Sequence, residues 1–384
     1  MSHRAIWLAL PAWAAAAYYL LALWAAVRWR RAPPPASRLT SGPPRGISIL
    51  KPVHGRDPRF YEAIASHARQ DHPDFELLFG VSDPEDAALE DIRRLQREFP
   101  AVPIAAYVVS TTAPNAKAGV LAELVRHARH SLLVVNDSDI RVEPDYLRSV
   151  AAPLEDPSIG LVTCLYRAHA ESWAARAEAL GIATEFAPSV LVARLLGVAE
   201  FALGSTMVFR AEDLRAIGGF EAIAGYLADD YQLGRHICQL GRRIEFSPVV
   251  VETDLGGGGW RQTWLHQLRW SRTIRVSRPS GYYGYVVTHA TLWALVAFAA
   301  GQWPAGMAAL GARMLSGIVV GAGILRDRRV RSDFWMIPLR DLFGFAVWLG
   351  GLAGDEVDWR GQRLKVRADG RITSPVPAAG RRGV

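Results

Sequence analysis

The sequence predicts an α/β protein built on a mainly parallel sheet, with apolar helices at both ends of the chain. Three observations support this fold class. Strand and helix patterns alternate from residue 47 onward, the apolar run 132–135 ends in Asn136-Asp137-Ser138-Asp139, and apolar stretches of membrane-spanning length flank this region. The 384 residues are enough for one large α/β domain and additional helices.

The composition favours contact with a membrane over contact with nucleic acid. Half of the residues are hydrophobic and the mean hydropathy is +0.08, which is high for a purely soluble enzyme. The net charge is +7, but no basic helix or aromatic-basic pattern typical of a nucleic-acid-binding module stands out, so we do not expect a nucleic-acid partner. The basic clusters flank apolar segments, a pattern that favours an anionic membrane surface. Cys164 and Cys238 have no disulfide or metal-ligand spacing and indicate a reducing, cytosolic compartment.

The N-terminal region, residues 1–31, is predicted to be a transmembrane helix. Residues 5–27 are uncharged and apolar, with Trp7 and Trp24 near the two ends. A signal peptide is the alternative, but no cleavage site of small residues precedes Arg28. Four arginines follow within 28–38, and the positive-inside rule places them in the cytoplasm. A Pro-rich linker is expected over 32–46.

The alternation of strands and helices continues through residues 47–255. Apolar runs bounded by turn residues predict strands, and apolar residues at helical spacing predict the segments between them. The predicted strands are 47–53, 75–81, 103–109, 132–135, 159–165, 204–210 and 244–253. The predicted helices are 57–69, 87–99, 116–130, 172–196 with a break at Pro188, 211–217, and one that opens at Asp229-Asp230.

Acidic residues follow the strands at the edge of the sheet where ligands of such folds bind. Asp137 and Asp139 come directly after the buried run 132–135, and two carboxylates on a tight turn can hold a divalent cation. Asp83 follows the strand 75–81 and would lie on the same edge. In isolation each acid could instead cap a turn or a helix, and the same holds for Asp229 and Asp230.

The region after the predicted domain is glycine-rich, then aromatic and basic. Residues 256–259 are four glycines, which do not match a phosphate-binding fingerprint and are expected to act as a hinge. Residues 260–278 alternate Trp and Leu with Arg, which predicts an amphipathic helix at the membrane interface, so 256–284 is taken as one unit.

The C-terminal apolar region covers residues 285–353. Stretches 285–303 and 306–325 are each long enough to span a membrane, although Arg313 inside the second is costly unless it faces protein. Stretch 334–353 is interrupted by charges and is expected to be re-entrant or interfacial. Residues 354–384 are expected to form a basic cytosolic tail.

Four motifs stand in a fixed order along the chain. They are Ser82-Asp83-Pro84, Asn136-Asp137-Ser138-Asp139, Ala228-Asp229-Asp230-Tyr231 and Leu268-Arg269-Trp270. Together they resemble the D, D, D, (Q/R)xxRW pattern of membrane-bound family 2 and 21 glycosyltransferases. The sequence is most similar to ceramide glucosyltransferases and to the related bacterial hopanoid-biosynthesis glycosyltransferases. The segments around Lys51 and Lys117, and residues 358–361, also look like this group.

Two positions depart from the family pattern. His266 occupies the position of the Gln or Arg that lies three residues before Arg269. Asp139 completes a full DxD motif, where the eukaryotic ceramide enzymes tend to have glycine, and this feature resembles the bacterial branch.

The resemblance implies a GT-A fold, that is, a Rossmann-like, mixed and mainly parallel sheet, over 47–255. It also implies a UDP-sugar donor and a divalent cation, Mg²⁺ or Mn²⁺. The roles it implies are metal binding by Asp137 and Asp139, donor binding by Lys51, Asp83, Lys117 and Asp137, and catalysis by Asp230 as general base with Arg269 and Trp270. A single displacement with one base implies inversion at the anomeric carbon.

The expected acceptor is a membrane lipid, because the predicted interfacial helix would hold the site against the bilayer. The bacterial likeness favours N-acetylglucosamine transfer to a hopanoid polyol of the bacteriohopanetetrol type, and ceramide glucosylation is the alternative. The expected location is the bacterial inner membrane, multi-pass, with a cytosolic catalytic domain. Three further alternatives are a processive polysaccharide synthase, a nucleotidyltransferase and a catalytically inactive membrane scaffold or lipid-binding protein.

Overall fold

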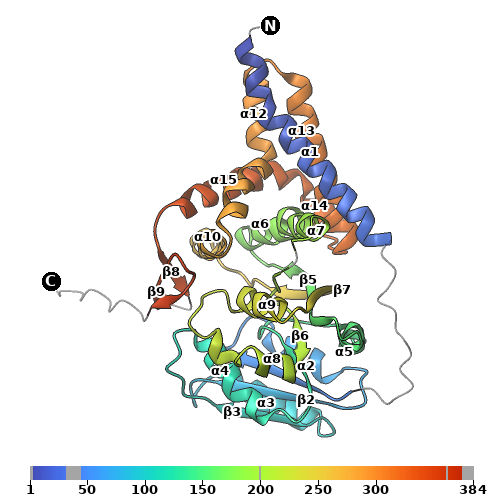
Figure 1. Ribbon diagram of the computed structural model, residues 1–384, viewed down its shortest axis with the longest axis vertical. Helices are drawn as coiled ribbons and strands as arrows, with labels where there is room; N and C mark the ends of the chain where they lie inside the picture. Colours follow the sequence, from blue (N-terminus) through green and yellow to red (C-terminus); the bar gives the residue numbers. More distant parts are fainter. Residues whose placement is uncertain (1–2, 32–44, 199, 360–361, 374–384) are drawn as a thin grey trace, which may run out of the picture.

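The computed structural model describes residues 3–31, 45–198, 200–359 and 362–373. The predicted Pro-rich linker, apart from residues 45 and 46, and the end of the predicted basic tail lie outside these ranges. Figure 1 shows an α/β part that carries the sheet and, above it, a helical part from which the N-terminal helix projects. The two parts are continuous, since one hydrophobic cluster runs from the sheet into the projecting helices.

A seven-stranded mixed sheet forms the α/β part, in the order β3-β2-β1-β4-β6-β5-β7. The strands are β1 (Ile47–Val53), β2 (Phe75–Val81), β3 (Ile104–Val108), β4 (Leu132–Val135), β5 (Ile159–His169), β6 (Met207–Arg210) and β7 (Arg243–Asp254). Only β6 runs antiparallel to its neighbours, β4 and β5, while the other pairs are parallel. The predicted fold class is therefore confirmed.

The central strands form because their side chains are apolar on both faces. Every residue of β1, β2 and β4 is buried, as expected for strands covered by helices on both sides. Successive side chains point to opposite faces, so Ile49 and Leu50 belong to two different core clusters. Helices α2, α3 and α5 cover one face, and α4, α8 and α9 pack on the other. The carboxyl ends of the parallel strands thus stay open along one edge.

The helices of the α/β part are short and lie close to their predicted positions. They are α2 (Phe60–Ala68), α3 (Ala88–Glu98), α4 (Ala116–Leu124), η1 (Val125–His127), α5 (Tyr146–Ala151), η2 (Ala152–Glu155), α8 (Ala211–Ala216), η4 (Phe220–Ala222) and α9 (Asp229–Gln239).

The helical part contains the remaining helices. They are α1 (His3–Arg31), α6 (Trp173–Gly181), η3 (Ile182–Phe186), α7 (Ala187–Leu195), α10 (Trp260–Ser277), α11 (Pro279–Gly284), η5 (Tyr285–Thr288), α12 (Ala290–Ala299), α13 (Trp303–Ile318), η6 (Val319–Ile324), α14 (Val330–Asp333), η7 (Phe334–Met336) and α15 (Ile337–Leu352).

Helices α6 and α7 form one continuous rod that is joined by η3, a π-helical turn. The predicted break at Pro188 is wrong, because the irregularity lies before the proline and does not interrupt the rod. Pro188 has no N–H to donate to the carbonyl of Thr184 four residues earlier. That carbonyl instead accepts a hydrogen bond from Nη1 of Arg313 at 2.8 Å. The π-turn therefore presents backbone polarity to a neighbouring helix, as such turns often do at functional sites.

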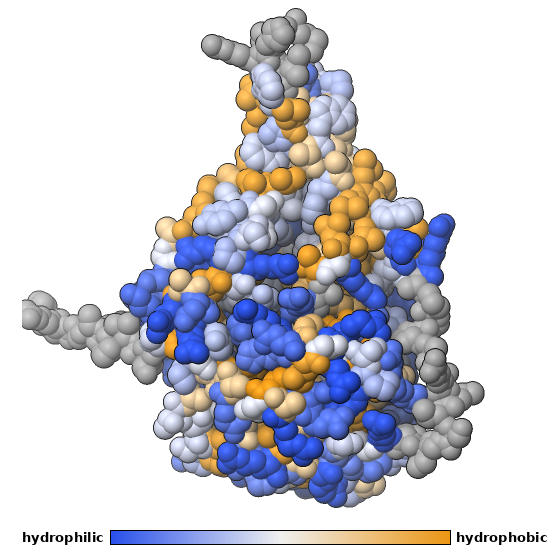
Figure 2. Space-filling view, in the orientation of Figure 1, coloured by the Kyte–Doolittle hydropathy of each residue, from blue (hydrophilic) through white to orange (hydrophobic). Residues whose placement is uncertain are grey.

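Two helical segments are long and apolar enough to cross a membrane by length and composition: 7–31, and 303–324, which comprises α13 and η6. The single span predicted over 285–303 is not formed, because these residues divide into η5 and α12. Ten residues of α12 rise only about 15 Å, half of a hydrocarbon core. Figure 2 shows strongly hydrophilic side chains mainly over the α/β part and more hydrophobic ones over the helical part.

Arg313 of α13 faces protein and not lipid. Its side chain is fully buried, and it donates through Nε and Nη2 to both carboxylate oxygens of Asp341 on α15. Its guanidinium also lies 5.1 Å from the ring of Tyr19 on α1. The cost expected for a charge in this apolar stretch is thus offset by a buried partner.

Helix α10 packs against α15, α11 and α6, so it is more enclosed than a free interfacial helix. Arg275 donates to the carbonyl of Leu352, and Arg272 donates to that of Ala353 at 3.2 Å. These arginines thus bind the carboxyl end of α15, where a helix favours cations. Helix α10 has the predicted amphipathic pattern, but Arg272 and Arg275 contact the end of α15.

The residues expected to form a basic tail begin with a small antiparallel sheet. Its strands are β8 (Glu356–Trp359), β9 (Gln362–Val366) and β10 (Ile372–Thr373). Leu227 packs into this sheet, and Tyr226 pairs with Arg371. This sheet therefore covers the segment that leads into α9.

Candidate active site

The turn after β4 is held by buried polar contacts. Asn136 is fully buried, and its side-chain amide donates to the carbonyl of Ser205 at 2.8 Å and to the hydroxyl of Tyr146 at 3.0 Å. Lys51 lies behind the turn and donates from Nζ to the backbone carbonyl of Asp137 at 3.0 Å. Burial lowers the pKa of Lys51 to about 7, although the nearby carboxylates of Asp139 and Asp137 act to raise it.

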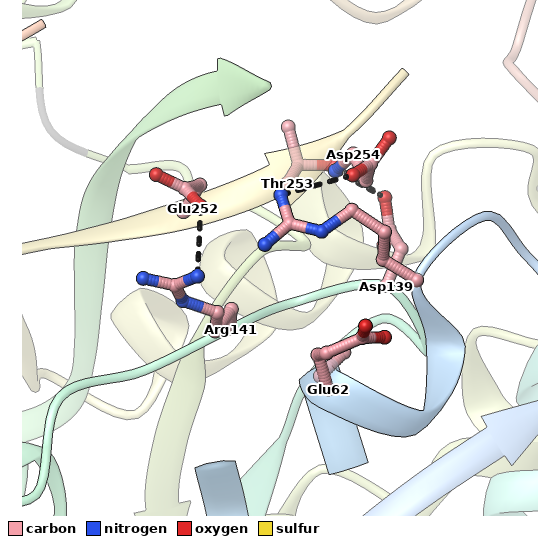
Figure 3. Close-up of a pocket in the computed structure, with 8 residues that line it drawn as sticks. Glu62, Asp139, Arg141, Glu252, Thr253 and Asp254 are labelled. Carbon is pink, nitrogen blue, oxygen red and sulfur yellow. Dashed lines mark hydrogen bonds and ion pairs between the residues drawn. The ribbon is translucent and has the colours of Figure 1, made fainter. Parts of the chain in front are cut away.

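Asp139 points toward the end of β7. Its carboxylate accepts hydrogen bonds from the hydroxyl of Thr253 and from the backbone N–H of Asp254. Burial raises the pKa of Asp139 to about 6, and the charge of Asp137 adds to this increase. Figure 3 shows Asp139 with Thr253 and Asp254 in a small pocket, where Glu252 pairs with Arg141.

Lys117 connects two of the predicted acidic motifs. It lies in the first turn of α4, which Asn115 caps by accepting from the N–H of Ala118 at 3.1 Å. Nζ of Lys117 donates to Oδ1 of Asp137 at 2.6 Å and lies 3.5 Å from Oδ2 of Asp229. Burial alone would lower the pKa of Lys117, but Asp137, Asp229 and Asp230 together raise it above its ordinary value.

Asp230 lies at the start of α9 and faces Asp137 across Gly204. Its carboxylate accepts from the backbone N–H groups of Gly204 at 3.0 Å and Tyr231 at 2.7 Å. A Cβ placed on Gly204 would lie 3.4 Å from Oδ2 of both Asp137 and Asp230. Burial raises the pKa of Asp230 to about 6, and Asp229 is the second contribution. The structure thus gathers Lys117, Asp137 and Asp230 round one backbone position.

The charges at this edge fit a divalent cation. The four carboxylates of the predicted motifs (Asp137, Asp139, Asp229 and Asp230), together with Asp57, lie around two lysines, Lys51 and Lys117. Within the described residues no three acidic, histidine or cysteine side chains form a metal cage. Asp137 and Asp139 would therefore supply two ligands, and diphosphate oxygens and water the others, which is a common arrangement for Mg²⁺.

Helix α10 approaches the site through aromatic contacts. The ring of Trp270 lies 6.4 Å from that of Phe186, which lies 5.6 Å from Tyr166 on β5. Burial raises the pKa of Tyr166, and Asp230 is the nearest charge that adds to this effect, so the phenol stays protonated beside the site. Arg269 is partly buried on the same helix, and its backbone carbonyl accepts from Thr273.

His266, at the position that departs from the family pattern, has a buried acidic partner. Its Nδ1 lies 2.5 Å from Oε1 of Glu178 on α6. Its ring lies 4.8 Å from that of Trp270. His266 thus links the rod of α6 to the Arg-Trp motif.

Asp83 is placed at the carboxyl end of β2, on the predicted edge. Its side chain is exposed, and its Oδ1 accepts from the backbone N–H of Glu85 at 2.9 Å. One strand, β1, lies between β2 and β4 in the sheet and so separates Asp83 from Asp137. The acid therefore forms a local turn at this edge, and its side chain stays exposed.

Sequence reasoning missed three residues of the site, and two of them carry no signal in the sequence. Tyr166 and Glu178 sit in ordinary strand and helix patterns, and only the tertiary structure brings them to Asp230 and His266. Gly204 could have been noticed, because glycine before a strand often marks a close approach of another group.

A mixed sheet of this order, with paired carboxylates at the end of its central strand, has the architecture of the GT-A fold of glycosyltransferases. The structure of the mannosyltransferase PcManGT from Pyrobaculum calidifontis, in complex with GDP-Man and Mn²⁺, shares that fold. The match has a TM-score of 0.54 with 20% identity, and it covers 90% of this chain and 99% of that one.

The chain belongs to glycosyl transferase family 21, whose family model matches residues 6–372. Ceramide glucosyltransferase 1 of Caenorhabditis elegans is 28% identical over 207 residues, which are 53% of this chain and 44% of that protein. The ceramide glucosyltransferase of Gibberella zeae is 30% identical over 124 residues, 29% of this chain and 23% of that protein. The matched part of this chain thus spans less than half the length of these relatives. Family membership and the apolar helices together indicate membrane association.

Proposed function

We propose that this glycosyltransferase moves a sugar from a UDP-sugar to a hydroxyl of a membrane lipid, with inversion at the anomeric carbon. The observation that carries the proposal is the gathering of Lys117, Asp137 and Asp230 round Gly204 at the open edge of the sheet. A group that accepts a proton thereby lies beside groups that can hold a charged diphosphate.

Asp230 is the proposed general base. Its raised pKa, about 6, suits a carboxylate that must take a proton from an attacking hydroxyl near neutral pH. Its oxygens accept hydrogen bonds from two backbone N–H groups, which hold the carboxylate in a fixed orientation. Since one base serves one displacement, the product would have the inverted configuration.

Asp137 and Asp139 are the proposed metal ligands. A divalent cation bound there would offset the negative charge that grows on the leaving diphosphate. Lys117 lies against Asp137 and can turn its ammonium toward a phosphate when the donor is bound. Asp83 is proposed to accept hydrogen bonds from the uridine part of the donor, and Arg269 and Trp270 to meet the diphosphate and the acceptor.

Lys51 has a different proposed role from the direct donor contact predicted from the sequence. Its side chain is fully buried, with Nζ bound to the carbonyl of Asp137. We infer that it fixes the backbone of the metal-binding turn from behind, and so acts on the donor only through Asp137.

The lipid acceptor is supported by the helical part. Arg28, Arg30 and Arg31 end α1 on the side of the α/β part, and Figure 1 shows the opposite end projecting away. If α1 and the segment 303–324 cross the bilayer, the catalytic part lies on the cytosolic side by the positive-inside rule. A site held there can receive a headgroup hydroxyl without extraction of the lipid.

Two acceptor classes follow from different observations. The complete DxD motif of Asp137 and Asp139 favours N-acetylglucosamine transfer to a hopanoid polyol at the bacterial inner membrane. The names of the curated relatives favour ceramide and glucose. A catalytically inactive scaffold is disfavoured, because the carboxylates of all three acidic motifs are present.

The test is a screen of purified protein with UDP-glucose and UDP-N-acetylglucosamine against membrane lipid extracts. Mass spectrometry should detect a glycolipid one hexose or one N-acetylhexosamine heavier than its acceptor. The Asp230→Asn variant is the negative control. Donor hydrolysis without any glycolipid would contradict the lipid acceptor, and no consumption of either donor would contradict a UDP-sugar transferase.

A further inference from the structure

A second group of buried polar side chains lies in the helical part, beside the Arg-Trp motif. It consists of Glu185 on η3, Tyr285 on η5, His289 before α12 and Arg340 on α15, and is called the polar junction below. Glu185 and Arg340 are 8% exposed and His289 is 1% exposed. Tyr285 donates from its hydroxyl to Oε1 of Glu185 at 3.0 Å.

The polar junction is short of hydrogen-bond partners. Nε and Nη1 of Arg340, Oε2 of Glu185 and Nε2 of His289 are buried without a hydrogen bond among the described residues. The one close approach of the two charged groups is 3.3 Å, between Nη2 of Arg340 and Oε2 of Glu185. A buried polar group left without a partner costs about 1–3 kcal/mol, so such atoms call for an explanation.

The neighbouring ion pair shows that the fold can satisfy a buried arginine when structure alone requires it. Arg313 uses Nε and Nη2 on Asp341, and Nη1 on the carbonyl of Thr184. Arg340 lies next to Asp341 in the sequence, in the same set of helices, yet keeps two nitrogens unused. Its open donors are therefore not a general feature of arginine in this region.

The backbone makes room for the Arg340 guanidinium. A Cβ at Gly181 would lie 2.4 Å from its Nε, and a Cβ at Gly344 would lie 2.6 Å from its Nη1. These are the same two nitrogens that have no partner. Any larger residue at either position would push the guanidinium aside, so both glycines are needed for Arg340 to take this position.

The polar junction lies between partly exposed aromatics and the catalytic motif. On one side, the ring of His289 packs at 5.3 Å from Phe345 and 5.9 Å from Trp348, and both are only partly buried. On the other side, Nη2 of Arg340 donates to Oε1 of Gln267, two residues before Arg269. Phe186, which follows Glu185, contacts Trp270.

Within the polar junction one carboxylate faces one guanidinium, since burial lowers the pKa of His289 and so favours its neutral form. Burial acts to raise the pKa of Glu185, but Arg340 and then His289 and Arg313 hold it below its ordinary value, so the carboxylate is ionised. A ligand must then be neutral, must donate to Glu185 and must accept from Arg340. An amide or a hydroxyl meets all three requirements.

We propose that the polar junction binds a neutral amide or hydroxyl of the acceptor lipid, other than the hydroxyl that receives the sugar. This inference rests on the proposed transfer to a lipid. It deepens that function, since the enzyme would select lipids with at least two polar groups near the end of the chain. Ceramide and polyhydroxylated hopanoids both carry such groups.

The test uses two matched pairs of acceptors in detergent micelles. N-octanoylsphingosine is compared with dioctanoylglycerol, which has a primary hydroxyl but no N–H and no second hydroxyl. Bacteriohopanetetrol is compared with a hopanoid that has a single terminal hydroxyl.

The double variant Glu185→Gln with Arg340→Gln keeps the net charge and the approximate size. We expect a fall of about 10- to 100-fold in kcat/KM, mainly through the acceptor KM, for the member with the extra polar groups. The member with one hydroxyl should change by less than about threefold.

A second variant and a control separate recognition from folding. His289→Phe keeps the ring contacts with Phe345 and Trp348 and removes Nε2, and should shift the same acceptor preference by about tenfold. The control, Arg176→Gln with Asp333→Asn, removes another hydrogen-bonded ion pair of α6 and should leave the preference unchanged.

Each outcome has a distinct meaning. If the wild-type protein glycosylates none of the four lipids or the extract, the proposed function fails. If the wild-type protein is active and the double variant lowers transfer to both members of a pair equally, the proposed function stands and the polar junction is structural. Equal loss in the control variant would also overturn the inference.

Discussion

The sheet edge and the polar junction both hold charged side chains away from water, but they differ in the balance of their charges. At the sheet edge, the four carboxylates of the predicted motifs and Asp57 lie around two lysines, and the pKa values of Asp139 and Asp230 rise to about 6. At the polar junction, one acid faces one base, yet four buried nitrogen and oxygen atoms have no hydrogen-bond partner among the described residues. The first site has an excess of negative charge, whereas the second has one charge of each sign and is short of hydrogen bonds.

This difference indicates the kind of ligand that each site would take. Excess carboxylates destabilise one another until a cation arrives, so the sheet edge suits a metal ion together with a charged diphosphate. A site with balanced charges is not stabilised by another ion, but unpartnered donors and acceptors are stabilised by hydrogen bonds to a neutral polar group. The Arg313–Asp341 pair, which lacks neither, suits a structural role.

The largest effect is expected from Asp230→Asn. Loss of the base should lower kcat by about 1,000-fold or more, while the affinity for the UDP-sugar changes little. Single-turnover kinetics and calorimetric donor binding measure the two quantities. Glu212→Gln, an exposed acid on α8, is the matched control and should behave like the wild type. Near-normal turnover of Asp230→Asn would rule out Asp230 as the base. The sheet edge would then bind the donor without supplying the general base.

Removal of the metal should have the next largest effect. Treatment with a chelator should lower activity by about 100-fold, and added Mg²⁺ or Mn²⁺ should restore it. Asp139→Ala should raise the metal concentration needed for half-maximal activity. An enzyme indifferent to chelator would show that the two lysines suffice to balance the acids of the sheet edge.

The structural ion pair can be tested through stability. Asp341→Leu alone should leave Arg313 buried without its partner and lower the free energy of unfolding by about 3 kcal/mol or more. The double variant Arg313→Met with Asp341→Leu should recover most of this loss. Thermal unfolding in detergent measures both, and no recovery in the double variant would mean that the pair itself contributes specific stability.

The smallest effect is a pH dependence. Asp230 must be ionised to accept a proton, and its pKa is raised to about 6. The value of kcat/KM should therefore be constant above about pH 7 and fall about tenfold per unit below pH 6. Steady-state rates from pH 5 to pH 8, at saturating metal, give this profile. A profile that stays flat down to pH 5 would show that burial and the neighbouring carboxylate of Asp229 do not raise the pKa of the base.

Much of the sheet edge follows from the order of residues along the chain. A buried run that ends in Asn136-Asp137-Ser138-Asp139 predicts both the strand and the acids at its carboxyl end, and β4 has the predicted bounds. The helix that opens at Asp229 is also confirmed. Lys117 was a candidate through the family resemblance, and the structure places it against Asp137.

Other features depend on contacts between distant segments. Lys51 lies in a strand pattern whose neighbours decide whether the ammonium faces solvent or, as here, the turn behind it. The basic residues Arg272 and Arg275 match an interfacial helix in the sequence but bind the end of α15 in the structure. The span predicted over 285–303 is interrupted by η5, so its apolar composition did not fix its length as a helix.

The sequence by itself determined the mainly parallel α/β fold, the apolar helices and the acids at the strand ends, because periodicity and turn residues act over a few positions. Only the tertiary structure decided which charges face one another. It paired His266 with Glu178 across 88 positions and Arg340 with Gln267 across 73 positions. Such pairings depend on how the helices pack, and helix packing is set by the whole hydrophobic core rather than by any local pattern.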